Sequence, residues 1–229
     1  MTADETKNNK GALWQQEYEL FSKCYRGRTD WVGIRKNGAY EQISGGLTFE
    51  RFKEHMELVN TYALYQMNAS GKVSFCLFDL DVLPRKQPSW EVMVEKIALE
   101  KEKTRRVIKT LLSFGIQKEN MLIEFPTVGY HLVLSFSQPL PAVTVKTFVQ
   151  LALAESGLAD TPFYPRTVEK GTLGDRVQLP FRINNNTGRR SNLITDFESF
   201  DPQSYSQTPD FSALKHIRPV AADLISGLV

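Results

Sequence analysis

The order of apolar segments between Lys72 and Ile183 constrains the fold more than any other feature of the chain. Short β-type runs alternate with longer amphipathic stretches in the order strand, helix, strand, strand, helix, strand. The strands are expected at 72–79, 121–125, 131–136 and 176–183, and the helices at 89–114 and 143–155. This order is typical of the split β-α-β arrangement in ferredoxin-like and RNA-recognition-motif folds. The sequence therefore predicts an α/β fold of the α+β kind.

A smaller α/β module is expected to precede this core. It contains helices at 12–25 and 48–59 and a hairpin with strands at 31–36 and 39–44. Asn37-Gly38 joins these two strands and is a strong two-residue turn signal. A strand at 62–67 is expected to form a second hairpin with the first core strand through the turn at 68–71. A last strand is expected at 192–196, after a turn at 186–188.

These elements predict the domain organisation. Residues 1–10 are polar and predict a disordered tail, whereas residues 11–229 predict a single domain. Within that domain we expect an N-terminal α/β module at 11–68 and an RNA-recognition-motif-like module at 69–200, followed by a C-terminal extension at 201–229.

The composition excludes several classes of protein. The 229 residues are 41% hydrophobic and 24% charged, which is typical of a soluble globular protein. No apolar run reaches membrane-spanning length, and the polar start lacks the apolar segment of a secretory signal. Cys24 and Cys76 give no disulfide framework, which favours a reducing cytoplasm. Two cysteines and three histidines are also few for a structural zinc site, so no zinc is expected.

Two aspartates, Asp79 and Asp81, stand at the end of the first core strand. Side chains alternate along a strand, so both carboxylates are expected on one face. Two like charges so close raise each other's pKa unless a cation lies between them, and carboxylate oxygens bind divalent cations well. The pair is therefore either a divalent-cation site or the polar end of a strand, where one aspartate caps the next element.

The aspartate pair is superficially similar to the first motif of haloacid-dehalogenase-type phosphatases, Asp-x-Asp-Gly-Thr. The similarity ends at Val82 and Leu83, which stand where glycine and threonine belong. Gly174-Asp175 also lacks the aspartate that would complete a Gly-Asp-x-x-x-Asp magnesium segment. A phosphatase is therefore the weaker interpretation of this pair.

Two further segments carry candidate functional residues. His131 starts an apolar strand two residues after Gly129, whose missing side chain would let a ligand approach the backbone. Downstream, residues 166–190 contain six basic residues against Glu169 and Asp175. The basic residues are interleaved with strand-like residues and asparagines, a mixture that suits contact with phosphates; they are Arg166, Lys170, Arg176, Arg182, Arg189 and Arg190.

Together, in this order and spacing, these segments resemble the archaeo-eukaryotic primase superfamily. That family carries Asp-x-Asp or Asp-x-Glu on a strand, then a small-x-His motif, then a hydrophobic-Asp motif. Asp79-Leu80-Asp81, Gly129-Tyr130-His131 and the run ending at Asp196 follow this pattern, which spans roughly residues 25–196. The likeness is greatest to primase-polymerases of mobile-element and defence systems, including those associated with CRISPR. Related sequences often have Ser-Gly-x-Gly-x-His, and this chain has Pro126 and Thr127 at the first two positions.

The resemblance implies a primase or DNA polymerase that joins nucleoside triphosphates to a 3′-hydroxyl by two-metal catalysis with Mg²⁺ or Mn²⁺. It implies metal binding by Asp79, Asp81 and Asp196, with Asp175 as the alternative third ligand. The implied nucleotide contacts are His131, Gly129, Tyr130, Arg182 and Arg190, and the implied nucleic-acid contacts are Arg176, Arg189 and Arg190. The implied partners are a DNA template with its primer, and CRISPR adaptation or other defence proteins. A monomer without a membrane partner is expected.

Two other function classes remain open at this point. The chain could be a non-catalytic module that binds single-stranded nucleic acid, with Phe75 and Tyr130 as candidate stacking residues on central strands. Such a module has no need of Asp79, Asp81 and His131 together, because paired acids repel a phosphate backbone. A metal-dependent nuclease on the same carboxylates is the third interpretation.

Overall fold

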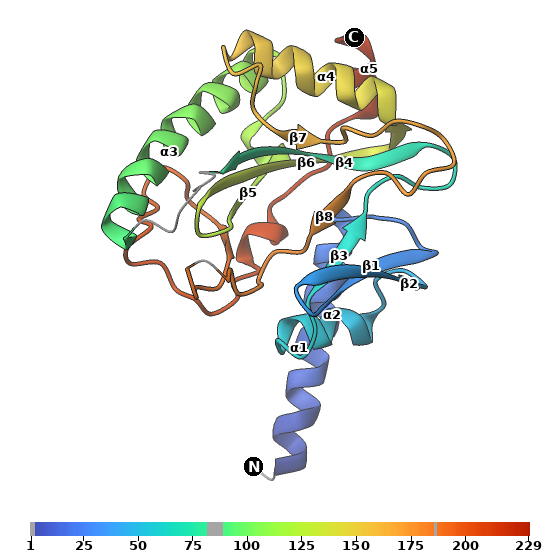
Figure 1. The fold of residues 1–229 in the computed structure, drawn as a ribbon, viewed down its shortest axis with the longest axis vertical. Coiled ribbons are helices and arrows are strands. Elements are labelled where there is room, and N and C mark those ends of the chain that lie inside the picture. Colours follow the sequence, from blue (N-terminus) through green and yellow to red (C-terminus); the bar gives the residue numbers. More distant parts are fainter. Residues whose placement is uncertain (1–2, 82–88, 186) are drawn as a thin grey trace.

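The computed structural model describes residues 3–81, 89–185 and 187–229 and shows two antiparallel sheets with helices (Figure 1). The helices are α1 (Ala3–Cys24), α2 (Phe49–Met56), α3 (Trp90–Ser113), α4 (Ala142–Glu155) and α5 (Ala222–Gly227), with short 3₁₀ turns η1 (Lys118–Asn120) and η2 (Ser212–Lys215). The strands are β1 (Trp31–Lys36), β2 (Ala39–Ser44), β3 (Tyr62–Tyr65), β4 (Lys72–Asp81), β5 (Met121–Phe125), β6 (Gly129–Pro141), β7 (Phe163–Tyr164), β8 (Arg176–Gln178) and β9 (Asn192–Ile194).

The larger sheet has the strand order β7-β4-β6-β5-β9. Its elements β4, α3, β5, β6, α4 and β7 follow one another along the chain, so the predicted strand-helix-strand-strand-helix-strand order is confirmed. The last strand of that pattern is, however, β7, whose Tyr164 pairs with Leu77 of β4. We expected residues 176–183 in this place, and that assignment was wrong. β7 has only two residues, too few to give a periodic signal in the sequence.

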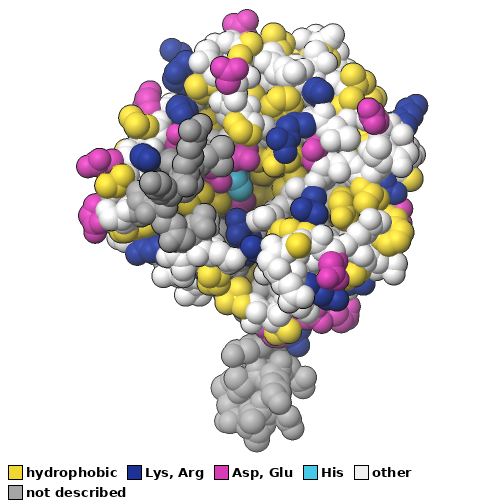
Figure 2. Space-filling view, viewed as in Figure 1, with side chains coloured by type: hydrophobic (Ala, Val, Ile, Leu, Met, Phe, Trp, Pro, Cys, Tyr) yellow, Lys and Arg dark blue, Asp and Glu magenta, His cyan; other side chains and the backbone are white. Residues whose placement is uncertain are grey.

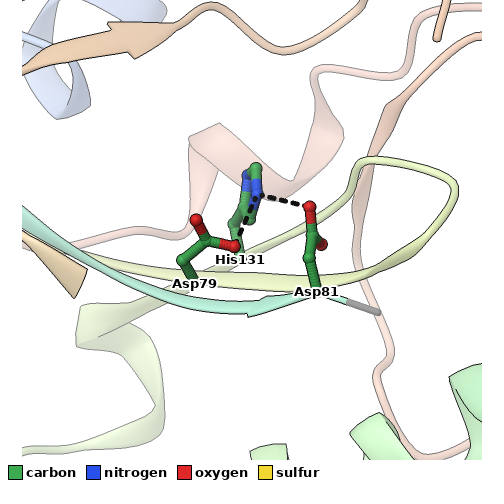
Figure 3. A group of neighbouring side chains, drawn as sticks. All are labelled: Asp79, Asp81 and His131. Atoms are coloured by element: carbon green, nitrogen blue, oxygen red, sulfur yellow. Dashed lines mark ion pairs between the residues drawn. The ribbon is translucent and has the colours of Figure 1, made fainter. Parts of the chain in front are cut away.

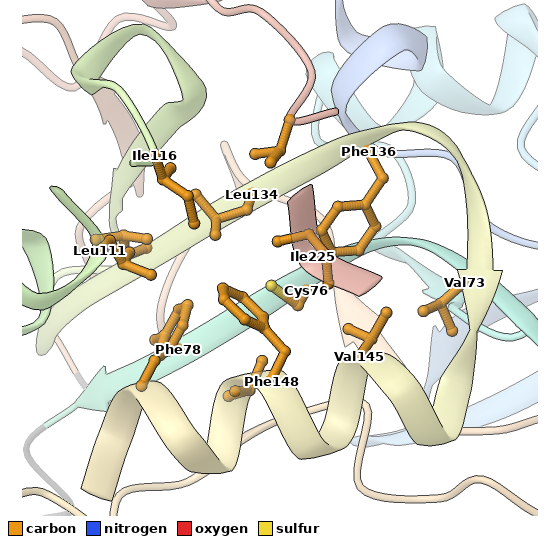
Figure 4. Close-up of a cluster of buried hydrophobic side chains, with 14 of the residues drawn as sticks. Val73, Cys76, Phe78, Leu111, Ile116, Leu134, Phe136, Val145, Phe148 and Ile225 are labelled. Atoms are coloured by element: carbon orange, nitrogen blue, oxygen red, sulfur yellow. The ribbon is translucent and has the colours of Figure 1, made fainter. Parts of the chain in front are cut away.

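Helices α3 and α4 cover one face of the larger sheet (Figure 1). Alternate residues of β4 and β6, such as Phe78 and Leu134, point into this layer and pack against Leu111 of α3 and Phe148 of α4 (Figure 4). α3 begins as predicted, because the side chain of Ser89 accepts the backbone N–H of Val92. The opposite face of β4 and β6 is apolar at Leu77 and Val133 and polar toward the end of β4, at Asp79 and Asp81.

The smaller sheet has the strand order β2-β1-β3-β8 and belongs to the N-terminal module. Asn37 and Gly38 both have positive φ, 51° and 82°, which is the two-residue turn predicted between β1 and β2. Thr48 caps α2 by accepting the backbone N–H of Arg51 at 3.3 Å. β8 joins this sheet by pairing with β3, so a strand from beyond α4 ties the two modules together.

A second core lies between the two sheets. It combines Phe21 of α1 and Phe52 of α2 with Leu64 of β3, and it extends to Leu77 and Val133 on the larger sheet. The two modules therefore share buried apolar surface.

Two local expectations for the N-terminal module differ from the structure. α1 begins at Ala3, where the sequence predicted a disordered tail over 1–10; this segment contains good helix formers such as Glu5 and Lys7 and no proline. The turn at 68–71 forms, but β3 and β4 diverge from it into different sheets and keep a single bridge between Met67 and Val73. A turn signal specifies a reversal of the chain and leaves strand pairing to tertiary contacts.

Candidate active site

The register of β4 against β6 brings the first candidate residues together. Asp79 pairs with His131, and Asp81 pairs with Gly129 one step further along the ladder. Because side chains alternate, Asp79, Asp81 and His131 all lie on the face opposite α3 and α4 (Figure 3). Leu80, between the aspartates, points into the helix-covered core.

The three side chains form one compact polar cluster (Figure 3). His131 Nε2 lies 3.7 Å from Asp79 Oδ1 and 3.5 Å from Asp81 Oδ2. Each residue offers one ligand atom, and all of these atoms lie within 4.8 Å of one another, so together they could hold a metal ion. Asp81 Oδ1 is buried and has no hydrogen-bond partner among the described residues. A carboxylate oxygen without a partner in a half-buried acidic cluster fits a divalent cation.

Burial and charge shift the proton affinities of this cluster. Burial raises the pKa of Asp79 to about 6; His131 opposes the rise and Asp81 adds to it. Burial alone would lower the pKa of His131, but the carboxylates of Asp81 and Glu124 together raise it well above its ordinary value. In the absence of a metal, a positively charged imidazole therefore lies between the two aspartates and reduces their repulsion.

Glu124 is a site residue that the sequence analysis missed. It pairs with His131 across β5 and β6, and its Oε2 accepts a hydrogen bond from His131 Nδ1 at 2.9 Å. Its side chain is only 4% exposed, so the ion pair is held inside the protein. The available signal was a glutamate within the otherwise apolar strand 121–125.

Gly129 has a packing role that differs from the one expected. A Cβ built on it would lie 2.3 Å from the carbonyl oxygen of Leu80 and 2.9 Å from Asp81 Oδ1. The space that we predicted for a ligand is therefore filled by β4 itself. Glycine at this position lets β6 approach β4 closely enough to place Asp81 beside His131.

The acidic cluster forms the floor of a cavity of about 420 Å³ between the two sheets. Figure 2 shows acidic and histidine side chains at the bottom of this hollow and Lys and Arg side chains around its rim. Among the described residues, Arg176 and Arg182 line the cavity without an ion-pair partner. Arg166 also lines it and packs over the ring of Tyr164, with its guanidinium 4.8 Å from the ring centre. An anionic ligand in this cavity would meet acids on one side and arginines on the other.

Asp175, the alternative third ligand, lines the same cavity but is already engaged. Its Oδ2 accepts the backbone N–H groups of Arg166 and Thr167 at 2.5 and 2.7 Å, and its Oδ1 accepts the Thr167 hydroxyl at 3.2 Å. These bonds fix the chain between β7 and β8. Asp175 therefore shapes the rim of the cavity.

The structure does not bring Asp196 to the aspartate pair. Asp196 follows β9 at the far edge of the larger sheet, and its Oδ1 accepts the backbone N–H groups of Glu198 and Ser199. The hydrogen bonds from Ser199 lower the pKa of Asp196, and Lys101 of α3 contributes from the helix-covered side. Two strands, β6 and β5, separate β9 from β4, so the prediction of Asp196 as a ligand beside Asp79 and Asp81 is corrected.

Arg189 and Arg190 also lie away from the cavity. The guanidinium of Arg190 donates to the carbonyl oxygens of Phe181 and Met56 at 2.7 and 2.6 Å, which ties the chain around the Ile183–Arg190 bridge to α2. The guanidinium of Arg189 packs 4.1 Å from the ring centre of Trp90, at the start of α3. Both side chains are committed to internal contacts; among the described residues of the basic segment 166–190, the arginines that line the cavity are Arg166, Arg176 and Arg182.

The aromatic candidates Tyr130 and Phe75 are core residues. Tyr130 is fully buried on the helix-covered side of the sheet, in edge contact with the ring of Phe197. Phe75 is fully buried between the two sheets and contacts Tyr25. Neither ring offers an open surface for a base.

Comparison with known proteins identifies the family. The sequence profile of the archaeo-eukaryotic primase domain of TOTE conflict systems matches residues 34–226. The chain belongs to this family. No curated protein matches the chain. Membership indicates a primase-like nucleotidyltransferase that binds nucleic acid and nucleoside triphosphates. No helix in the described part of this primase-family chain has the length and apolar character that a membrane span needs.

Proposed function

We propose that this chain is a template-directed nucleotidyltransferase, a primase or DNA polymerase that joins nucleoside triphosphates to a 3′-hydroxyl within a defence system. One observation carries the proposal. Asp79, Asp81 and His131 lie on one face of the larger sheet, at the floor of a cavity whose wall includes Arg176 and Arg182. A triphosphate and a divalent cation have opposite charges, and this cavity offers partners for both.

Asp79 and Asp81 would hold the cation, with Mg²⁺ or Mn²⁺ as the natural choices for oxygen ligands. In nucleotidyl transfer, two such ions when bound supply Lewis-acid stabilisation of the attacking and leaving oxygens. The protein's own contribution is to hold both carboxylates on one strand face. The unpartnered Asp81 Oδ1 gives the pair a further donor toward the cation.

His131 would donate a hydrogen bond from Nε2 to a phosphate oxygen of the incoming nucleotide. Glu124 holds Nδ1 from behind, so the ring presents Nε2 to the cavity in a fixed orientation. Such a charge-assisted bond contributes roughly 1.5–3 kcal/mol to binding. His131 and Glu124 therefore act as a unit, with His131 on the nucleotide and Glu124 as its positioning residue.

Arg176 and Arg182 would neutralise the phosphates of the nucleotide or of the nucleic acid. Both line the cavity, and neither has an ion-pair partner among the described residues. Arginine presents several N–H donors in a planar fork, which suits bidentate contact with phosphate oxygens. These two arginines would take the phosphate-binding roles that the sequence predicted for Arg176, Arg182, Arg189 and Arg190.

A primer-extension assay tests the proposal. The purified chain is incubated with labelled nucleotides, a primed template and Mn²⁺, beside an Asp79→Asn variant. Extension by the wild-type chain that the variant lacks supports the proposal. Retention of the template without extension identifies a binding module, and cleavage of the template identifies a nuclease. Extension by a folded Asp79→Asn variant at the wild-type rate would contradict the assignment of this site.

A further inference from the structure

The smaller sheet has two faces of different character. Alternate residues such as Val32, Leu64 and Val177 point into the core with α1 and α2. The opposite face is built from the remaining strand residues, and several of these are exposed or half-buried. We call it the open face; it carries Trp31, Gly33 and Arg35 from β1, Tyr40 and Gln42 from β2, Ala63 from β3, and Arg176 and Gln178 from β8.

Glycine in the middle of β1 shapes the open face. A Cβ on Gly33 would lie 3.0 Å from Arg176 Cδ and 3.5 Å from Tyr40 Cδ1. Without that Cβ, the Arg176 side chain lies flat across the sheet, and its guanidinium is 4.5 Å from the centre of the Tyr40 ring. Arg35 pairs directly with Tyr40 across β1 and β2. The Tyr40 ring on the open face thus has one guanidinium over it and a second arginine beside it in the sheet.

Positive charge on the open face has no local compensation. The strand residues that form this face include two arginines and no carboxylate. Burial raises the pKa of Tyr40, while the charges of Arg182, Arg35 and Arg176 oppose the rise. Of these arginines, Arg176 lies over the Tyr40 ring and Arg35 is its cross-strand partner. In the described parts of the chain, none of the three arginines forms an ion pair.

Hydrogen-bonding groups on the open face also lack partners. The hydroxyl of Tyr40 and the Oε1 atom of Gln178 are buried without a hydrogen bond among the described residues. Buried polar atoms normally find a partner in the protein or in a bound molecule. The Tyr40 hydroxyl can donate to an anionic oxygen, and Gln178 Oε1 can accept from an N–H donor such as that of a base, so together they suit a polar occupant that offers both kinds of group.

The open face continues into the cavity of the proposed active site. Arg176 and Gln178 of β8 belong to the open face and also line the cavity. A ligand on the open face would therefore lead directly to the cluster of Asp79, Asp81 and His131.

We infer that the open face binds single-stranded nucleic acid, with bases stacked on Tyr40 and Trp31 and phosphates held by Arg35 and Arg176. Single-strand binding surfaces combine positive charge that follows the backbone with aromatic rings on which bases stack. The role of this surface as the entry path of a template or primer rests on the proposed function. The binding itself requires neither metal nor nucleotide.

Fluorescence anisotropy with a labelled oligo-deoxythymidylate, in buffer without metal or nucleotide, tests the inference. Tyr40→Ala should weaken binding about fivefold or more through lost stacking, and Tyr40→Trp should retain it. Arg35→Glu should weaken binding and lower the log–log salt slope by about 0.7 for each lost phosphate contact. Lys36→Glu is the charge-reversal control on the other face of the same strand; because it also breaks the exposed ion pair between Lys36 and Glu41, the melting temperatures of both variants are compared as well.

Three outcomes would overturn the inference: no binding by the wild-type chain, equal losses for Arg35→Glu and Lys36→Glu, or full affinity in Tyr40→Ala. Asp79→Asn separates this inference from the proposed function, because it should bind the oligonucleotide normally and fail to extend a primer. If the wild-type chain shows the expected binding pattern and extends no primer, the open face is supported and the polymerase proposal fails. If it extends primers while binding is independent of Tyr40 and Arg35, the open face alone is wrong.

Discussion

Glu124 and His131 face each other across β5 and β6 and share a hydrogen bond of 2.9 Å between Oε2 and Nδ1. Because this bond engages one ring nitrogen, the other is directed at Asp79 and Asp81. The glutamate side chain is almost fully buried, so this hydrogen bond is shielded from solvent. The orientation of His131 therefore depends on a residue that itself does not reach the cavity.

Glu124→Ala should raise the KM for nucleotide and lower kcat/KM by about tenfold to a hundredfold, the usual effect of removing a partner behind a functional histidine. Glu124→Gln should retain most of the activity, because its amide oxygen can still accept from Nδ1. Steady-state kinetics of primer extension measure both variants. If both lose melting temperature equally while the KM of each stays at the wild-type value, Glu124 has only a structural role.

Asp79→Asn should abolish synthesis and raise the melting temperature of the metal-free protein. The change removes one of two like charges in a half-buried site and keeps the shape of the side chain. Mn²⁺ should stabilise the wild-type protein by mass action and stabilise the variant much less. Thermal melts with and without Mn²⁺ measure both effects. Glu95→Gln, at an exposed acid of α3, is the control and should respond to Mn²⁺ like the wild type.

Strand alternation explains why part of this site could be predicted from the sequence. The shared face of Asp79 and Asp81 follows from their spacing alone. Their proximity to His131 depends on the register of β4 against β6, which is a long-range property. The proximity of Glu124 to His131 depends on a second long-range register, that of β5 against β6, and the other residues of its strand indicate only a buried core strand.

Asp196 and the arginine pair show what local patterns cannot specify. The run ending at Asp196 matches the expected motif, but β9 adds to the sheet beside β5, at the edge farthest from β7. The choice of edge depends on packing partners such as Ile123, which no local pattern names. A run of arginines likewise indicates charge, and only the fold shows that Arg190 donates to backbone carbonyls.

His55 predicts how stability depends on pH. Its ring is fully buried, with Nδ1 accepting the backbone N–H of Tyr62 at 3.1 Å and Nε2 lying 2.8 Å from the carbonyl oxygen of Pro180. Burial lowers the pKa of His55 to about 4, the backbone bond to Pro180 opposing that shift and nearby arginines adding to it. The folded chain therefore keeps this histidine neutral down to that pH.

An unfolded histidine has a pKa near 6.5, so the unfolded chain binds a proton that the folded chain excludes between about pH 6.5 and pH 4. The contribution of His55 to the free energy of unfolding is complete above about pH 6.5. It falls as the pH drops from there toward 4, by up to about 1.4 kcal/mol per pH unit. Urea unfolding at several pH values measures the slope, and His55→Gln isolates the histidine from other titrating groups. An equal slope in this variant and the wild type would show that His55 is not responsible.

Arg182→Ala and Arg190→Ala should separate phosphate contact from structural support. Both remove one positive charge, but Arg182 lines the cavity, whereas Arg190 is half-buried and bonded to Phe181 and Met56. Arg182→Ala should weaken binding of single-stranded DNA and lower the log–log salt slope by about 0.7, with an unchanged melting temperature. Arg190→Ala should keep the wild-type slope and lower the melting temperature, because two buried carbonyl oxygens lose their donor, at a cost of about 1–3 kcal/mol each.

Anisotropy across a salt series gives the salt slope of each variant, and thermal melts give the melting temperature of each. A reduced slope in Arg190→Ala with wild-type stability would place the nucleic acid beside Arg190 and away from the cavity.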